Sequence, residues 1–271
     1  MCEFCINHGE GKKWYEVMGH YSRELFARDN RQQFMKKLFA QLRAEGAQLE
    51  KLAALKKRLP FAYRFVRQMA TRKMKRDHFG QVVPLEDAEM VVSMVQSITR
   101  LPCVCRSSTK QRDDARYCLA VGMDPAGLLG DYPELKNSLE VLTAEEAKKL
   151  LRAFDAEGLI HSLWTFKTPY IGGICNCDRD CLAYRAQVAA DLLQVMFKAE
   201  YVAGIDMTRC SGCRACQRVC QFGAIEYSSL DNKNTVNIRK CYGCGVCRCA
   251  CGQRAITLVE RHTVPEAAGL W

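Results

Sequence analysis

Apolar residues recur at helical spacing through the first third of the chain. Between Tyr21 and Met74, residues Phe34, Leu38 and Leu42 lie four positions apart, and glycine and proline are sparse. Side chains at this spacing share one face of an α-helix. The pattern predicts a mostly helical region over residues 21–74.

The pattern downstream predicts two more bounded helices. One opens at Pro84, with acidic residues in its first turn, and ends before Pro102. The next opens at Thr143, where Glu146 stands three residues later and forms a capping box, and Gly158 ends it. The same pattern indicates a strand and a further helix, over residues 159–166 and 182–201.

The net charge of +10 is unevenly distributed along the chain. Residues 51–76 hold ten Lys and Arg and no Asp or Glu, with Phe61, Tyr63 and Phe65 among them. A basic helix of this kind suits an acidic protein face, a nucleic acid or an anionic lipid, and it can also be a solvated helix face. Residues 206–262 are basic as well, with 9 Lys and Arg against 4 Asp and Glu.

Two cysteine runs near the C-terminus carry the clearest chemistry. Each has the spacing C-x2-C-x2-C-x3-C, beginning at Cys210 and at Cys241. Runs of this spacing hold cubane [4Fe–4S] clusters, and the fourth cysteine of each run ligates the cluster of the other. The spacing therefore assigns two ligand sets. They are Cys210, Cys213, Cys216 and Cys251 for one cluster, and Cys241, Cys244, Cys247 and Cys220 for the other.

The two runs belong to an internal repeat, in which Cys210 aligns with Cys241 and Ala224 with Ala255. Such a repeat suits a pseudo-twofold fold of two short hairpins and two helical turns. Zinc knuckles also use C-x2-C pairs, but two matching four-cysteine runs favour iron–sulfur. The stretch at about residues 206–260 resembles bacterial dicluster ferredoxins, which implies two [4Fe–4S] clusters and an electron-transfer role.

Three residues depart from the ferredoxin pattern. That family has proline after the fourth cysteine of each run, where this chain has Gln221 and Gly252. Without the proline ring we expect a relaxed turn and altered solvent access beside each cluster. Cys249 adds a thiol inside the second run. It is either a spare thiol or a competitor of Cys251, and the existing spacing favours the spare thiol.

Six more cysteines stand in the middle of the chain and include two C-x-C pairs. A third iron–sulfur cluster that draws on both pairs is a natural solution, because one cubane needs four thiols. We expect the pairs to lie in irregular loops, from which neighbouring side chains can reach one metal. The alternative is buried cysteine acting as a small apolar residue, chiefly for Cys118. The third-cluster candidates are Cys103, Cys105, Cys118, Cys175, Cys177 and Cys181.

A wider resemblance covers about residues 84–258. The order P-C-x-C-R, C-L-x-x-G, G-L-I-H, I-C-N-C and then a dicluster ferredoxin is similar to a group of ferredoxin-fused iron–sulfur proteins from anaerobic bacteria. The resemblance implies cluster binding and names no substrate. Many relatives carry two adjacent cysteines after I-C-N, where this chain has Cys177 and Asp178. His161 is suited to tune or ligate a cluster or to move protons beside one, and a hydrogen-bonded structural histidine is the competing interpretation.

The N-terminus carries a compact motif, Cys2-x2-Cys5-x2-His8. Two thiols and an imidazole at this spacing supply three ligands for zinc, with a fourth from elsewhere. They also suit an iron–sulfur cluster that a distant cysteine completes. A terminus with incidental cysteines is the alternative. We predict an additional metal site at these three residues.

These elements predict an α+β fold. We expect a mainly helical N-terminal and middle region, with a winged-helix-like unit where helix, glycine and strand follow one another, and a C-terminal dicluster ferredoxin-like domain. The expected division has three parts. They are residues 1–80, with the Cys/His motif and the basic helical region, the cysteine-rich middle domain at 81–204, and the ferredoxin domain and tail at 205–271.

Composition and missing motifs narrow the function. Seventeen cysteines without a secretory signal pattern at the start indicate metal clusters in a reducing cytoplasm, and no apolar run approaches the length of a membrane span. Neither a Gly-rich dinucleotide fingerprint nor a P-loop is visible. We therefore expect a cytoplasmic electron-transfer protein of an anaerobe, a subunit of an oxidoreductase complex whose redox partner has an acidic face.

Two other functions fit the same residues. One is an oxidoreductase whose middle cluster keeps an open iron and reduces a small substrate. The other is a redox-responsive nucleic-acid-binding protein that uses the basic helix and the winged-helix-like segment, and its binding would depend strongly on salt.

Overall fold

The computed structural model describes residues 1–44, 46–124, 126 and 138–271. A seven-stranded sheet forms the centre of the molecule, in the order β4-β2-β3-β6-β5-β1-β7. Neighbouring strands are antiparallel, except that β1 and β7 are parallel. The strands are β1 (Gly80–Val83), β2 (Ile98–Leu101), β3 (Cys118–Val121), β4 (Glu140–Leu142), β5 (Ile160–Thr165), β6 (Ile171–Cys177) and β7 (Met196–Phe197).

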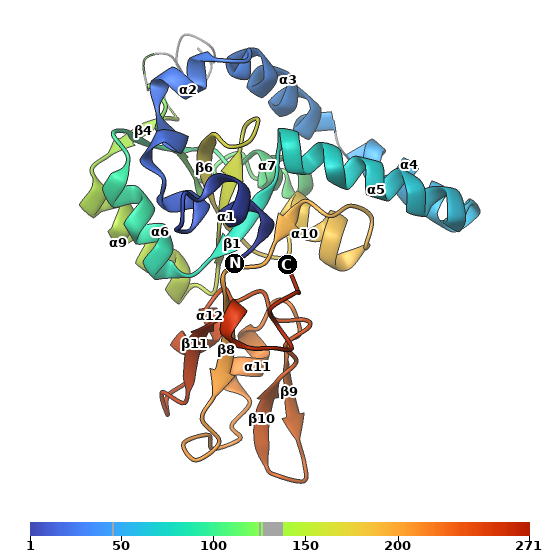
Figure 1. Ribbon diagram of the computed structural model, residues 1–271, viewed down its shortest axis with the longest axis vertical. Coiled ribbons are helices and arrows are strands. Elements are labelled where there is room, and N and C mark those ends of the chain that lie inside the picture. Colours follow the sequence, from blue (N-terminus) through green and yellow to red (C-terminus); the bar gives the residue numbers. More distant parts are fainter. Residues whose placement is uncertain (45, 125, 127–137) are drawn as a thin grey trace.

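Helices pack on this sheet and extend beyond it (Figure 1). Helices α6 and α9 pack together on one face, and the N-terminal segment around Trp14 shares their apolar core. Helix α3 packs over the other face, where Met35 and Leu38 meet Phe166. The helices of this part are α1 (Glu3–His8), α2 (Arg23–Ala27), α3 (Arg31–Ala44), α4 (Gly46–Arg58), α5 (Pro60–Asp77), α6 (Leu85–Met94), α7 (Val104–Lys110), α9 (Ala144–Ala156) and α10 (Leu182–Tyr184).

The predicted helical region over residues 21–74 is confirmed by helices α2 to α5, apart from residue 45, which lies outside the described residues. Pro60 is the first residue of α5, where its missing N–H costs no helical hydrogen bond. Helices α4 and α5 lie side by side and project from the body of the molecule (Figure 1). Phe61 and Phe65 are exposed on this helical pair, which we call the α4–α5 arm.

The C-terminal part forms a small lobe below the sheet (Figure 1). Its first and last strands, β8 (Tyr201–Ile205) and β11 (Ile256–Glu260), pair antiparallel, and β9 (Ile225–Ser228) and β10 (Lys233–Val236) form a hairpin. The sequence predicted two hairpins; the structure has one, because the other pair joins the two ends of the lobe. The two short helices that complete it are α11 (Ala215–Val219) and α12 (Val246–Cys249).

The predicted helix over residues 182–201 is wrong. Only α10 and a π-helical turn, Arg185–Ala189, are helical there. The side chain of Gln187 then accepts the N–H groups of Val195 and Met196, each at 2.8 Å, and donates to the Met196 carbonyl. This contact turns the chain, so that β7 adds to the sheet edge beside β1. Tertiary pairing has therefore overridden a helical pattern.

The middle region also contains more sheet than the sequence indicated. The helix that begins after Pro84 ends at Met94, and Ile98 lies in β2 between two partner strands. The helix from Thr143 is confirmed with its capping box, and β5 confirms the strand predicted over 159–166. However, β5 and β6 are flanked by β1 and β3. A winged-helix-like unit is not formed, because other strands cover both sides of this hairpin.

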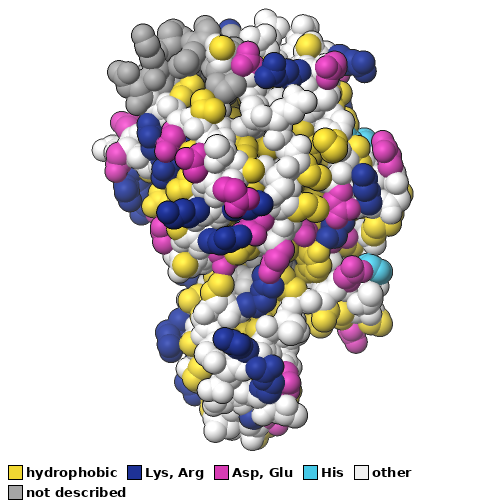
Figure 2. Space-filling view, turned by 90° about the vertical axis from the view of Figure 1, so that its left-hand side faces the viewer, with side chains coloured by type: hydrophobic (Ala, Val, Ile, Leu, Met, Phe, Trp, Pro, Cys, Tyr) yellow, Lys and Arg dark blue, Asp and Glu magenta, His cyan; other side chains and the backbone are white. Residues whose placement is uncertain are grey.

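One face of the molecule shows how charged side chains are distributed over the two parts. On the face shown in Figure 2, Lys and Arg side chains are more prominent than acidic ones in the lower part of the molecule. Among the described residues, no helix has the length and apolar character that crossing a membrane would require.

Candidate iron–sulfur and metal sites

The first C-terminal ligand set lines one cavity. Cys210, Cys213, Cys216 and Cys251 all border it, together with Ile205 and Ile256. The fourth cysteine of the second run therefore lies beside the first three of the first run, as the spacing predicted. Burial and the neighbouring Cys251 thiol raise the pKa of the Cys216 thiol. Thiols held this close are better accommodated as thiolates on a cation, so this donor set fits a [4Fe–4S] cluster.

The second set converges in the same way. Burial raises the pKa of Cys247 to about 12, and the nearby thiols of Cys241 and Cys220 add to the effect. The pKa of Cys244 is raised well above its usual value by burial and by the same neighbours. Cys220, the fourth cysteine of the first run, has thus joined the second set. These four thiols also fit a [4Fe–4S] cluster.

The internal repeat extends to the backbone around the sulfurs. The N–H of Ala224 donates to the Cys220 sulfur at 3.3 Å, and the N–H of Ala255 donates to the Cys251 sulfur at the same distance. The N–H of Ala203 donates to Cys241 at 3.5 Å. Hydrogen bonds to sulfur stabilise thiolates and set the potential of a cluster that they bind.

Each run depends on a glycine between its first two cysteines. Gly212 and Gly243 have φ values of +70° and +71°. A Cβ at Gly212 would lie 2.2 Å from the Asn232 carbonyl oxygen, and one at Gly243 would lie 2.0 Å from that of Tyr201. Only glycine accepts both the left-handed backbone and the close approach.

The positions that lack the family proline have different roles. The side chain of Gln221 donates to the Gly158 carbonyl at 2.6 Å, and the Gln221 carbonyl accepts the Tyr184 hydroxyl at 2.5 Å. Gln221 therefore ties the C-terminal lobe to the sheet. A Cβ at Gly252 would meet nothing within 4 Å.

Cys249 points away from both cysteine sets. Its thiol donates to the Asp155 carboxylate of α9 at 2.6 Å. Partial burial and this carboxylate raise the pKa of Cys249 to about 11. The geometry agrees with a spare thiol and offers no support for competition with Cys251.

The six middle cysteines come from four separate elements. Cys103 and Cys105 flank the start of α7, and Cys118 opens β3, directly opposite Cys175 of β6. Cys177 ends β6, and Cys181 precedes α10. The expectation of irregular loops is wrong for both C-x-C pairs, because Cys105 lies in α7, and Cys175 and Cys177 lie in β6. Residues two apart on a strand share a face, so β6 itself directs both thiols to one side.

These six thiols form one connected group. Cys118 interacts with Cys103 and with Cys175, and Cys181 interacts with Cys105 and with Cys177. Hydrogen bonds between the thiols, together with burial, raise the pKa values of Cys103, Cys105, Cys175 and Cys177. The same hydrogen bonds lower the pKa values of Cys118 and Cys181. In the described chain, no three of the six sulfurs lie within 4.8 Å of one another. The group is therefore too wide for a single ion and suits a multi-iron cluster.

A buried arginine that the sequence did not single out faces this group. The Arg106 guanidinium lies 3.9 Å from the Cys103 sulfur, donates to the Asp178 carboxylate at 2.8 Å and stacks 4.0 Å over the Tyr117 ring. Asp178 raises the pKa of Arg106 further, so its charge is permanent. This fixed cation offsets negative charge on the thiolates. The sequence could have indicated Arg106, because this residue directly follows the first C-x-C pair.

His161 lies in β5, opposite Asn176 of β6, and is fully buried. Its Nδ1 pairs with the Asn176 side-chain oxygen at 2.6 Å, and its Nε2 lies 3.8 Å from Asp155. These contacts match the structural interpretation of this residue. They also connect Asn176, between the two β6 cysteines, to the carboxylate that holds Cys249.

The three cysteine groups are linked through two apolar clusters that share Cys220. Cys105, Cys175 and Cys181 share an apolar cluster with Cys220 and Cys244 of the second C-terminal set. Cys220 is also part of the cluster that contains Cys216, Cys241 and Cys251. A groove opens nearby, lined by Arg179, Tyr184, Arg185, Ala189, Ala190, Gln221, Phe222 and Gly223.

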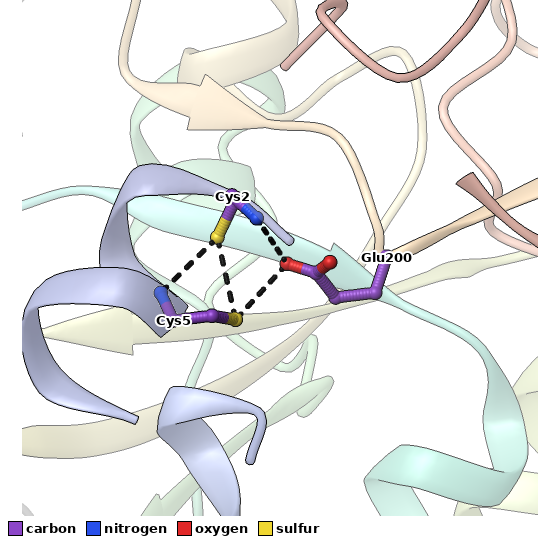
Figure 3. A group of neighbouring side chains, drawn as sticks. All are labelled: Cys2, Cys5 and Glu200. Atoms are coloured by element: carbon purple, nitrogen blue, oxygen red, sulfur yellow. Dashed lines mark hydrogen bonds between the residues drawn. The ribbon is translucent and has the colours of Figure 1, made fainter. Parts of the chain in front are cut away.

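The N-terminal motif is only partly assembled as predicted. Cys2 and Cys5 lie together, but the third potential ligand beside them is Glu200, which precedes β8, and not His8 (Figure 3). His8 instead faces His20, with ring centroids 6.3 Å apart. The difference has a simple cause: His8 ends α1, whereas Cys2 caps the start of this helix and Cys5 lies in its first turn, both buried.

Comparison with known proteins finds similarity in the C-terminal lobe. Residues 203–226, which contain the first cysteine run, match the 4Fe-4S binding domain family. Two curated proteins, each named archaeal-type glutamate synthase (NADPH), from Thermotoga maritima and Thermotoga sp. strain RQ2, are each 39% identical to the chain over 59 residues. The match covers 22% of this chain and 12% of each glutamate synthase. The chain therefore contains a 4Fe–4S ferredoxin-type domain.

Proposed function

We propose that this protein transfers single electrons to or from a redox partner, with two [4Fe–4S] clusters in the C-terminal lobe and a third iron–sulfur cluster at the middle cysteines. When bound, such clusters supply one-electron redox chemistry. The chain's part is to hold them close together, to shield them from water and to set their charge environment.

The observation that carries this proposal is that two apolar clusters, which share Cys220, contain cysteines of all three groups. The fourth cysteine of each run crosses to the other set, so the two C-terminal sites share a core. Cys220 and Cys244 belong to the same apolar cluster as Cys105, Cys175 and Cys181 of the middle group. Electron transfer slows steeply with distance, so cysteine groups that share one core suit a relay.

Fixed charges and hydrogen bonds in the chain support the same role. Arg106 places a permanent cation beside the middle thiols, and backbone N–H groups donate to Cys220 and Cys251. Both features favour electron-rich thiolate-bound centres, because they stabilise added negative charge.

Iron and sulfide quantification on anaerobically purified protein tests the number of clusters. Two clusters correspond to about eight irons per chain, and three to about twelve. We expect about twelve, and the double change Cys103→Ala with Cys175→Ala should remove about four. Cys249→Ser is the matched control and should keep them all. An unchanged iron count in the double variant would refute the middle cluster. Fewer than about eight irons per chain in the wild type would refute the two C-terminal clusters.

We further propose that the α4–α5 arm docks an acidic face of the redox partner. The arm projects from the body, and it carries ten Lys and Arg without an acidic residue between positions 51 and 76. Phe61 and Phe65 are 89% and 67% exposed among these charges, as expected for the apolar contacts of a docking surface. Charge complementarity of this kind mainly raises the association rate.

Stopped-flow reduction by a small acidic ferredoxin, used as a probe, tests the arm. Arg64→Glu on α5 should slow the reaction several-fold at low salt, and the difference should shrink as salt rises. Lys149→Glu on α9 makes the same charge change on an exposed helix elsewhere and should have little effect. If both variants slowed the reaction equally, the effect would come from the net charge of the protein, and docking at the arm would be contradicted.

A second candidate function is reduction of a small anionic substrate at the middle group. The observation that favours it is the groove that Arg179 and Arg185 line together with Tyr184, residues that stand on either side of Cys181 in the sequence. Paired guanidinium groups recognise carboxylates and other oxyanions. Electron paramagnetic resonance of the reduced protein with a panel of small oxyanions tests this function. A spectrum that no anion changes, and that Arg179→Ala leaves unaltered, would exclude it.

A further inference from the structure

We propose that Cys2, Cys5 and Glu200 bind a single divalent transition-metal ion, with Zn²⁺ as the best match to their chemistry. The site is separate from the three cysteine groups of the proposed electron path. It replaces the predicted Cys2, Cys5 and His8 set with a carboxylate that stands far away in the sequence and beside the thiols in space (Figure 3).

The three ligand atoms are arranged for one ion. The sulfurs of Cys2 and Cys5 lie 3.5 Å apart, and the Cys5 sulfur lies 3.0 Å from Glu200 Oε1. Two sulfurs on one tetrahedral zinc, with bonds of about 2.3 Å, are about 3.8 Å apart. Only a small outward movement is therefore needed. Within the described residues, no other three Cys, His, Asp or Glu side chains come together this closely.

Burial makes a bound cation the natural partner of these groups. Cys2, Cys5 and Glu200 are only 1%, 2% and 3% exposed. The buried Arg261 guanidinium acts on Glu200 through its charge, but the two form none of the ion pairs found among the described residues, so the carboxylate lacks a directly bound counter-ion. A divalent ion would balance the carboxylate and the two thiolates that form when zinc displaces their protons.

Neighbouring groups orient the ligands. The Gln81 side-chain amide donates to the Lys198 carbonyl at 3.0 Å and to Glu200 Oε1 at 3.5 Å, and it lies 3.8 Å from the Cys2 sulfur. Trp14 in turn donates to the oxygen of the same amide. The Cys2 N–H also donates to Glu200 Oε1 at 3.3 Å. Such supports are typical of protein metal sites and hold the ligands before the ion arrives.

The location of the site indicates what the ion would do. Glu200 lies between β7, at the edge of the large sheet, and β8, the first strand of the ferredoxin-type lobe. Arg261 also fixes this junction, because it donates to the carbonyls of Ala199 and Tyr201. An ion shared by α1 and Glu200 would fasten the N-terminal helix to the junction, so we infer a structural role. Most structural zinc sites have four protein ligands, whereas here water would complete the tetrahedron, so the structural role is inferred from the position of the site at the junction.

Metal analysis combined with X-ray absorption at the zinc edge tests the proposal on the intact, anaerobically purified protein. We expect about one zinc per chain with two sulfur neighbours at about 2.3 Å and the remaining ligands oxygen or nitrogen. Cys5→Ser and Glu200→Gln should each lose most of the zinc while the iron content stays the same. His8→Asn is the matched control and should keep zinc at the wild-type level.

Several results would overturn the proposal. One is wild-type protein that takes up no zinc after incubation with Zn²⁺ and a thiol reductant. Another is a four-sulfur zinc signal, which would mean that zinc had replaced iron at a cluster. A third is zinc loss in His8→Asn equal to that in Glu200→Gln. Mass spectrometry that finds a Cys2–Cys5 disulfide in the freshly purified protein would also count against it, because a dithiol switch would then occupy the site.

Discussion

Replacing Gly243 by alanine tests whether the second cysteine set depends on its tight turn. Gly243 has a φ of +71°, and a Cβ there would lie 2.0 Å from the Tyr201 carbonyl oxygen and 3.1 Å from the Cβ of Ala199. The left-handed backbone costs an L-residue roughly 1–2 kcal/mol. Overpacking adds roughly 1–3 kcal/mol, since the obstacle is backbone and cannot rotate away. We therefore expect the free energy of unfolding to fall by about 2–5 kcal/mol.

The consequence for the cluster site follows from the position of Gly243 between Cys241 and Cys244. A turn that opens by even a small amount separates the two thiols, so the variant should retain about four fewer irons per chain. Urea unfolding followed by circular dichroism gives the stability, and iron and sulfide analysis gives the occupancy.

Gly252→Ala is the matched control for this experiment. Gly252 does not have a positive φ, and a Cβ there would meet nothing within 4 Å. Its effect should stay within about 0.5 kcal/mol, with full iron content. The repeat-related change Gly212→Ala should behave like Gly243→Ala, because a Cβ there would lie 2.2 Å from the Asn232 carbonyl oxygen. If Gly243→Ala matched Gly252→Ala in both stability and iron, the reasoning about the turn would be wrong.

Three further predictions address neighbouring features. Cys249→Ser should leave the iron count unchanged, because the Cys249 thiol bonds to Asp155; a loss of irons would make Cys249 a ligand. Gln221→Ala should lower the urea midpoint, at a cost of about 1–2 kcal/mol, by removing the bond to the Gly158 carbonyl, whereas the same change at the exposed Gln217 of α11 serves as the control. Burial between the rings of Trp164 and Phe166 lowers the pKa of His78 to about 4. The folded state therefore binds fewer protons than the unfolded chain between about pH 6.5 and 4, and stability should fall by up to about 3 kcal/mol as the pH drops through this range. His78→Gln should flatten that dependence, and an unchanged pH profile would contradict the assignment.

Local patterns in the sequence predicted the features that local interactions control. The capping box at Thr143 and Glu146 involves residues three positions apart, and the structure contains it. The C-x2-C-x2-C spacing places three thiols in one tight loop, and the known crossing of the fourth cysteine supplied the rest. Cys251 accordingly borders the cavity of the first run.

Contacts between distant residues decided the remainder. Residues 182–201 have a helical pattern, but pairing of β7 with β1 and the contacts of Gln187 end the helix early. The seven-stranded sheet joins short strands whose order along the chain does not show their order in space.

The cysteine-rich sites also combine features set by local sequence with features set by tertiary contacts. The sequence by itself determined which residues carry thiols and that two runs have ferredoxin spacing. Only the tertiary structure placed the six middle thiols in one group, set Arg106 beside them and exchanged His8 for Glu200 at the N-terminal pair. The physical reason is that ligands within one loop are set by backbone geometry over a few residues. A carboxylate 195 positions from its thiol reaches it only when the sheet has brought β7 beside β1.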